Sequence, residues 1–285
     1  MEKNLYIYTN EFLLQMIQKK TISKYTQKNC FYMGERNTNR FLYKYMDLES
    51  AIISLTKGTI RFVEPYTWPD KFEGRFYNAS YVQVEGASGN TPPVLACCLT
   101  HAPVNEASWK VYSSGKTGIG SRCVQFKINK KAFREAIAKS AKGFALYEGL
   151  VNYELDDYNI LHLHERYSSV GTEKELFLEF FKDFDLASYL SLLLIKRQAF
   201  RHEQEQRYFL VPGENEMDLK GDFGAKDLSV CWTDFLEDVK ISEDCTDTEL
   251  VILTNVLRLQ NIMIEPKRQY IYAADEEPIT IDSNL

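Results

Sequence analysis

The most distinctive stretch of the chain reads Lys196-Arg-Gln-Ala-Phe200-Arg-His-Glu203-Gln-Glu205-Gln-Arg207-Tyr-Phe-Leu-Val211. Its first part is polar and charged, as at the end of a helix, and its last part is an apolar run typical of a buried strand. We therefore predict a helix from about 187 to 200 that leads directly into a strand over 205–211. Pro212-Gly213 ends this strand.

Two carboxylates and several cations meet at this junction. If the last residues are extended, Glu203, Glu205 and Arg207 project from one face, because side chains on a strand alternate with a period of two. Carboxylates so close repel each other, so the pKa of one should be raised unless Arg207 or Lys196 compensates. Such a pair suits general acid–base catalysis or the stabilisation of a sugar oxocarbenium ion. The alternative, which spacing alone favours, is a solvated charged helix end.

Two other places combine aromatic residues with turn signals. One is the loop Trp68-Pro-Asp70-Lys-Phe72-Glu73, and loops commonly present functional groups. The other is Trp109-Lys-Val-Tyr112, which precedes a glycine-rich turn. The plainer interpretation of both places is packing, in which these rings belong to the hydrophobic core.

The composition is that of a folded protein. The chain has 285 residues, and its 13% aromatic content disfavours disorder. Predicted strands and helices alternate irregularly, without repeated βαβ units, which favours an α+β fold. We expect strands near 41–46, 59–63, 94–99, 123–128, 150–153 and 269–273. We expect helices near 10–20, 47–55, 105–112, 131–141 and 248–259, and one that begins at 172.

The net charge of -6 is unevenly distributed. Residues 1–45 contain eight basic and three acidic residues, whereas residues 214–285 contain six basic and seventeen acidic ones. We expect a basic helical segment over 1–40, an α+β core over 41–213, and an acidic segment over 214–285 that packs on the core. The asymmetry indicates that one end meets an anionic partner such as RNA or DNA, or that the two ends face each other. Simple solvation of the charges is the alternative.

Several kinds of site and compartment are disfavoured. The first residues do not resemble a secretory signal, and no apolar stretch is long enough to cross a bilayer, so we expect no membrane partner. The six cysteines show no framework spacing, which suits a reducing cytoplasm. The four histidines and the cysteines form no suitable ligand set, so we expect no metal.

At the three places described above, and in a tyrosine-rich segment before them, the chain resembles a bacterial family of unknown function that is often encoded near defence genes. The first strand of that family matches Tyr43-Lys44-Tyr45, and its aromatic loop loosely matches residues 69–73. Its middle motif matches Trp109, Tyr112, Gly118 and Phe126. Its last motif, Lys-x-x-x-Phe-x-x-Glu-x-Glu-x-Arg, matches Lys196, Phe200, Glu203, Glu205 and Arg207 without a gap. The resemblance covers roughly residues 41–211.

The layout is also similar, at a distance, to the ADP-ribosyltransferase fold: an aromatic first strand, a helix, a second strand and a late Glu-x-Glu at a strand start. This resemblance implies a split mixed β-sheet with surrounding helices. It also implies an NAD-consuming toxin or phage-defence effector that transfers ADP-ribose to a macromolecule, with RNA or DNA as the possible target. In that superfamily the first strand usually carries His or Arg, where this chain has Lys44.

The resemblance implies catalytic roles for Glu205, Glu203 and Arg207. Glu205 would stabilise the sugar cation, and Glu203 would orient the incoming nucleophile. NAD is expected as a substrate, its cationic nicotinamide ring stacking on a tyrosine and its pyrophosphate meeting Lys44 or Arg61. The residues expected to bind it are Tyr43, Lys44, Tyr45, Arg61, Trp109 and Tyr112.

Two other functions stay open. One is a non-catalytic recognition module, in which Trp68, Trp109 and the tyrosines line a groove for a peptide or a nucleobase. The other is a metal-dependent nuclease built from Asp70, Glu73, Glu203 and Glu205. A toxin would also have an antitoxin or inhibitor protein as a partner. The enzymatic hypothesis requires that the acidic pair and the tyrosine-rich strand form opposite walls of one crevice.

Overall fold

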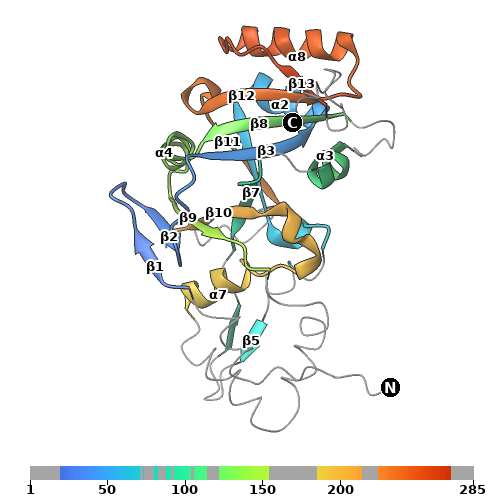
Figure 1. The fold of residues 1–285 in the computed structure, drawn as a ribbon. Helices are drawn as coiled ribbons and strands as arrows, with labels where there is room; N and C mark the ends of the chain where they lie inside the picture. Colours follow the sequence, from blue (N-terminus) through green and yellow to red (C-terminus); the bar gives the residue numbers. More distant parts are fainter. Residues whose placement is uncertain are drawn as a thin grey trace, which may run out of the picture.

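The computed structural model describes residues 20–70, 73, 80–82, 88–90, 93–103, 106–113, 122–153, 185–213 and 224–270. Within these ranges the chain forms an 11-stranded mixed β-sheet with helices packed on it, and a separate two-stranded sheet (Figure 1). The fold is therefore α+β, as the irregular order of elements predicts.

The main sheet is built from strands that are far apart in the sequence. From one edge to the other, its order is β1 (Ile22–Lys24), β2 (Cys30–Met33), β9 (Phe144–Leu150), β10 (Glu205–Pro212), β7 (Leu95–Thr100), β3 (Phe41–Asp47), β8 (Cys123–Asn129), β12 (Leu236–Ser242) and β13 (Lys267–Gln269). A branch from β7 is made by β4 (Thr59–Val63) and β11 (Ala225–Ser229). The small sheet pairs β5 (Ser80–Val82) with β6 (Ser88–Asn90). Between the paired strands, β2–β9 and β12–β13 are parallel and the other pairs are antiparallel.

The described helices are α2 (Leu48–Lys57), α3 (Glu106–Ser113), α4 (Lys130–Ser140), α7 (Leu186–Leu192) and α8 (Asp247–Leu259), with short 3-10 helices η1 (Pro65–Thr67), η2 (Gln198–Glu203) and η4 (Trp232–Asp234). The boundaries of α2 follow from its sequence. The Asp47 carboxylate accepts the backbone N–H of Ser50 at 2.8 Å, and Gly58 ends the helix with a φ of 60°. No helix among the described ranges is both long and apolar enough to cross a membrane.

Two hydrophobic cores lie on opposite faces of β10. Tyr208 and Leu210 pack in the larger core, which also contains buried residues of α2, α4 and α8. Phe209 and Val211 pack in the smaller core with buried residues of α7. Because side chains on a strand alternate, Glu205 and Arg207 point to the same face as Phe209, toward the smaller core. This alternation determines which part of the molecule surrounds the acidic motif.

The helix predicted over 187–200 is not continuous. Helix α7 ends at Leu192, and Ile195 instead forms a bridge with Asn152. The Asn152 N–H donates to the Leu194 carbonyl at 2.7 Å, and the Lys196 N–H donates to the Asn152 carbonyl at 2.9 Å. These long-range bonds hold the chain extended before η2 begins. The helix expected from 172 lies outside the described residues, as does that over 10–20 apart from its last residue.

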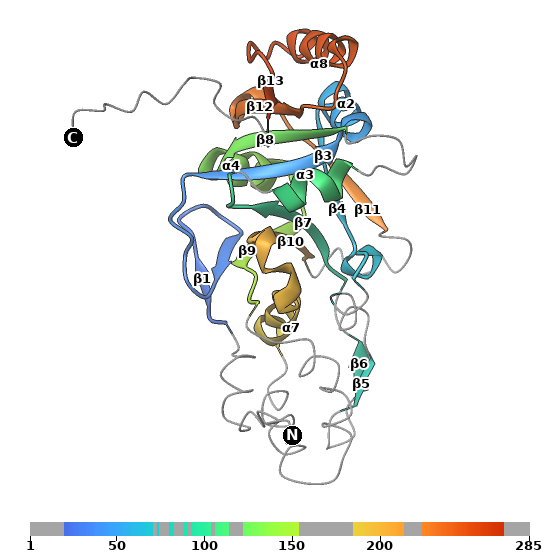
Figure 2. The same ribbon diagram turned by 45° about the vertical axis from the view of Figure 1, so that its right-hand side comes forward.

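The strand boundaries differ from the prediction at three places. Strand β9 ends at Leu150, so the strand expected over 150–153 comes earlier, and β13 ends at Gln269. The described part of the segment predicted as helical, residues 20–40, contains β1 and β2. Strands β11 and β12 come from the acidic segment and pair with β4 and β8 (Figure 2). Both terminal segments therefore contribute strands to the central sheet.

Candidate functional site

The turn between η2 and β10 positions the two carboxylates. Gln204 has a φ of 43°, in the left-handed region, and its carbonyl accepts the His101 N–H at 3.1 Å and the Thr100 hydroxyl at 3.3 Å. Glu205 and Arg207 then share one face of β10, as predicted. Glu203 instead belongs to η2, so the expected extended conformation over all three residues is wrong at this position. The turn at Gln204 nevertheless brings the side chain of Glu203 close to that of Glu205.

Lys196 lies at the centre of a buried cluster of charges. Its Nζ is 2.5 Å from Glu203 Oε2, 2.7 Å from Glu205 Oε1 and 3.2 Å from Glu73 Oε1. The side chain of Lys196 is only 7% exposed. An ammonium group so deeply buried requires close anionic partners, and it has them from three segments of the chain.

Arg207 is the second cation of this cluster. Its Nε donates to Glu205 Oε2 at 2.8 Å, its Nη1 donates to the Leu193 carbonyl at 2.7 Å, and its Nη2 donates to Glu73. The guanidinium also lies 4.2 Å from the centre of the Trp68 ring. Arg207 is thus enclosed, with a partner for each of its three nitrogens.

The two carboxyls of the motif differ in protonation. Burial, together with a hydrogen bond to Glu205, raises the pKa of Glu203 to about 8. Burial would also raise the pKa of Glu205, but the charges of Arg207 and Lys196 outweigh it and hold this pKa well below its usual range. The pair therefore combines one ionised carboxylate with one carboxyl that holds a proton at neutral pH. This is the separation that mutual repulsion predicts.

The register of the sheet aligns the motif with the tyrosine-rich strand. Glu205 is paired with Thr100, and Thr100 is paired with Tyr43 on β3. Residues directly opposite one another share a face, so Tyr43 lies on the side of Glu205, at a distance of about 10 Å for two strand spacings. Tyr43 is partly exposed, and burial together with the nearby Asp238 raises the pKa of its hydroxyl.

Tyr45 and Trp109 pack against each other. Their ring centroids are 5.3 Å apart with an interplanar angle of 89°, and both residues are buried. The Tyr45 hydroxyl accepts a hydrogen bond from Gln125 Nε2 at 2.6 Å. This supports the plainer interpretation of Trp109 as a core residue. Helix α3, which carries Trp109, contacts both β3 and η2 (Figure 2). The side chain of Tyr112 lies outside the described part of the structure.

Lys44 and Arg61 do not join the cluster. Lys44 alternates with Tyr43 and so points to the opposite face, where its Nζ lies 3.5 Å from Cys97 Sγ. The guanidinium of Arg61 binds both carboxylate oxygens of Asp227, at 2.7 and 2.8 Å. The expected contact of these cations with a pyrophosphate on the Glu205 side thus has no support from their positions.

The acids of the nuclease alternative bind cations of the chain itself. Asp70 Oδ2 is 2.9 Å from Arg197 Nε, and Glu73, Glu203 and Glu205 surround Lys196. Across the described ranges, no group of three His, Cys, Asp or Glu side chains is arranged to hold a metal ion. The geometry favours ion pairing over metal binding.

Two contributors were absent from the catalytic set expected from the sequence. Glu73 is 5% exposed and binds both cations, and the loose match of its loop to the family motif was the signal for it. The hydroxyl of Tyr153 accepts the backbone N–H of Glu205 at 2.8 Å. No sequence pattern indicates Tyr153, because its contact depends on how the chain continues after β9.

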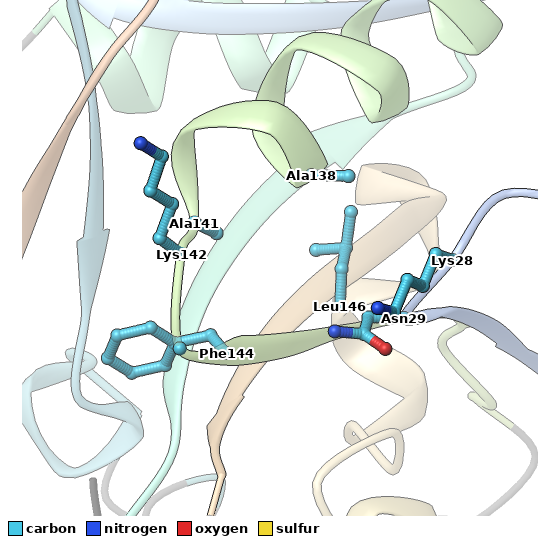
Figure 3. A pocket seen from close by; sticks show the side chains of 8 residues that line it. Lys28, Asn29, Ala138, Ala141, Lys142, Phe144 and Leu146 are labelled. Carbon is cyan, nitrogen blue, oxygen red and sulfur yellow. The ribbon is translucent and has the colours of Figure 1, made fainter.

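Two hollows are lined by described residues. One, of about 560 Å³, is lined by Lys20, Met33, Glu35, Leu150, Val151, Asn152, Tyr153 and Arg201. The other, of about 330 Å³, lies between α4, β9 and the β1–β2 turn (Figure 3) and is lined by Lys28, Asn29, Ala138, Ala141, Lys142, Gly143, Phe144 and Leu146. Tyr153 connects the first hollow to Glu205 through its hydrogen bond. A crevice between Glu205 and Tyr45 stays a prediction, because neither hollow contains them.

Similarity to known proteins is found among solved structures. No protein-family model and no curated protein sequence matches the chain. Among solved structures, the chain is similar to Thermus sp. 2.9 DarT in complex with carba-NAD+ and to the same protein in complex with NAD+. In both comparisons the identity is 9% and the TM-score is 0.34. The match covers 82% of this chain and 96% and 98%, respectively, of the DarT chains.

Proposed function

We propose that this chain is an NAD-consuming transferase of the ADP-ribosyltransferase type, acting as a toxin or phage-defence effector on a macromolecule. The observation that carries the proposal is the buried pair at the start of β10. There Glu205 is held ionised while Glu203 holds a proton. Glycosyl transfer uses two such carboxyls, because a sugar cation needs a nearby negative charge, and the incoming nucleophile needs a second carboxyl that takes up its proton once it has itself ionised.

Glu205 supplies the negative charge. As the bond between the ribose C1′ and the nicotinamide nitrogen breaks, its electron pair leaves with the nicotinamide, which becomes neutral. Positive charge develops on the ribose, and the Glu205 carboxylate stabilises it. One well-aimed group of this kind contributes on the order of 3 kcal/mol, about a hundredfold in rate. Arg207 and Lys196 keep this carboxylate ionised and fixed in place.

Glu203 handles the proton. Its side chain is 18% exposed, against 8% for Glu205, so it is the more accessible of the two carboxyls. In its ionised form it accepts the proton of the attacking hydroxyl or amine while the new bond to C1′ forms. This assigns Glu203 the role of general base, in addition to orienting the nucleophile.

For NAD binding we propose Tyr43 as the stacking residue. It is partly exposed and lies two strands away from Glu205 on the same face of the sheet. This separation suits a nicotinamide ring that is bonded to the reacting ribose. Tyr45 and Trp109, which are buried, would support the position of β3 instead of contacting the ring. Lys44 and Arg61 are left out of the proposed NAD-binding set.

We propose a nucleic acid, RNA or DNA, as the target of the modification. The basic balance of residues 1–45 supports this class, because Lys and Arg add salt-sensitive affinity for phosphates. An antitoxin or inhibitor protein and a cytoplasmic location belong to the same proposal. Binding to RNA or single-stranded DNA that does not weaken as salt is raised would contradict it.

The experiment that tests the activity is the release of nicotinamide. The purified protein is incubated with NAD and a cell lysate, alongside the variants Glu205→Gln and Glu203→Gln. We expect release by the wild type and a loss of about a hundredfold or more in Glu205→Gln. Glu135→Gln, which removes an exposed carboxylate from α4, is the matched control and should release nicotinamide at the wild-type rate. Absence of release, or equal release by wild type and Glu205→Gln, would exclude the proposal.

A further inference from the structure

Glu73 is a buried acid that the proposed mechanism does not use. It reaches the cluster from the loop after η1, whereas the other four charged groups come from the segment 196–207. Its Oε1 lies 3.2 Å from Lys196 Nζ, and its Oε2 binds Arg207 Nη2. It is thus the carboxylate that contacts both cations from outside the motif.

The number of charges explains why this matters. The cluster contains the carboxylates of Glu73, Glu203 and Glu205 and the cations of Lys196 and Arg207. With all five groups ionised it would carry one excess negative charge, which is costly in a buried site. One proton makes the cluster neutral. Glu203, the most exposed of its carboxylates, shares a hydrogen bond with Glu205 and is where that proton resides.

We propose that Glu73 is a positioning residue of this site, which keeps the proton on Glu203 by binding Lys196 and Arg207 from a separate loop. The role in catalysis rests on the proposed function, whereas the effect on protonation does not. If Glu73 became neutral, two carboxylates would face two cations. The ammonium group of Lys196 would then attract the Glu203 carboxylate more strongly, and the proton of Glu203 would dissociate more readily.

Among the described groups around Glu203, the Glu205 carboxylate is the other negative charge that binds both Lys196 and Arg207. Lys196 faces Glu203 from the segment after α7, and Glu205 and Arg207 face it from β10. Tyr153 contacts the backbone of Glu205, Cys98 lies near Glu205 and Arg207 with its thiol pKa raised by burial, and Arg201 and His202 are neighbours on η2. In the same loop as Glu73, Asp70 is paired with Arg197.

The test is a titration of the carboxyl of Glu203 by NMR, in full-length protein labelled with 13C at the glutamate side chains. The Glu203 signal is assigned by its absence in Glu203→Gln. We expect a midpoint near pH 8 in the wild type. Glu73→Gln should lower the midpoint by about one pH unit or more, and Glu73→Asp, which keeps the charge, should stay closer to the wild type.

Two further variants make the result independent of any one substitution. Glu73→Ser repeats the neutral change with a smaller side chain, in case Glu73→Gln does not fold. Asp70→Asn is the matched control, since it removes a carboxylate from the same loop but leaves Lys196 and Arg207 with their partners. It should keep the wild-type midpoint. An unchanged midpoint in a folded neutral variant of Glu73, or an equal shift in Asp70→Asn, would overturn the inference.

The pH dependence of nicotinamide release separates this inference from the proposed activity. If the protein releases nicotinamide, the Glu73→Gln profile should move to lower pH together with the NMR midpoint. A shifted midpoint without any release would contradict the proposed function and leave the role of Glu73 in protonation standing. If nicotinamide is released but Glu73→Gln shifts neither the pH profile nor the NMR midpoint, the proposed function stands and the role of Glu73 is contradicted.

Discussion

The raised pKa of Glu203 has a direct consequence for the dependence of activity on pH. A general base works only after it loses its proton, and burial beside Glu205 raises the pKa of Glu203 to about 8. Activity should therefore rise from pH 6 to pH 8, with an increase of about fivefold between pH 7 and pH 8, and it should level off at higher pH. Initial rates of nicotinamide release in a series of buffers measure this. A flat profile over the same range would contradict the assigned role.

The buried ion pairs of Arg207 should also contribute to the stability of the fold. Replacement of Arg207 by Met leaves one carboxylate oxygen of Glu73 and one of Glu205 without a buried cation, while Lys196 still binds the other oxygen of each. We expect a loss of about 3–5 kcal/mol in the free energy of unfolding, measured by urea denaturation. Arg61→Gln, which breaks a pair whose arginine side chain is 61% exposed, should cost less than about 1 kcal/mol. Similar losses in both variants would show that burial is not what makes Arg207 important.

Among secondary-structure elements, the turn that joins η2 to β10 has an unusual backbone. Gln204 adopts the left-handed conformation at a φ of 43°, which L side chains rarely adopt. Gln204→Gly should therefore keep or raise the melting temperature, whereas Gln204→Val should lower it and cost about 1–2 kcal/mol. The two melting curves provide the test, and destabilisation by glycine would contradict the interpretation.

The elements show which features a sequence can predict. Local signals are reliable: the cap of Asp47, the stop at Gly58 and the alternation in 59–63 predict α2 and β4 closely. Contacts between distant segments are not visible in this way. The extended residues after α7 depend on bonds to Asn152. The short strands β1 and β2 pair with each other, and β2 joins the sheet through β9, which comes more than one hundred residues later.

The site shows the same division. Composition and spacing place Glu203, Glu205 and Arg207 together. Mutual repulsion between the two carboxylates predicts that Glu203 and Glu205 differ in protonation. The opposite orientation of Lys44 follows from strand alternation, but the contact of its Nζ with Cys97 depends on how β3 and β7 pack. Likewise, the pairing of Arg61 with Asp227 requires β11 to lie beside β4, which no local pattern predicts.

On the scale of the whole molecule, the acidic segment is part of the central sheet. Strand β12 covers β8, and Leu253 and Leu257 of α8 pack in the larger core. Removal of residues 214–285 would therefore expose a strand edge and much apolar surface. We expect the fragment 1–213 to be insoluble or unfolded, as measured by circular dichroism and solubility. A soluble fragment with a cooperative melting transition would contradict this.

The alignment of Glu205, Thr100 and Tyr43 across three strands makes the site sensitive to chain length. Because the two faces of a strand exchange with every residue, a deletion inside β10 that shifted its pairing by one position would replace Glu205 by Gln206 on this face. Glu205 and Arg207 would then point toward the larger core, which contains buried residues of α4. Homologous chains should accordingly vary in length within their loops, while the number of residues between the motif and the end of β10 stays constant.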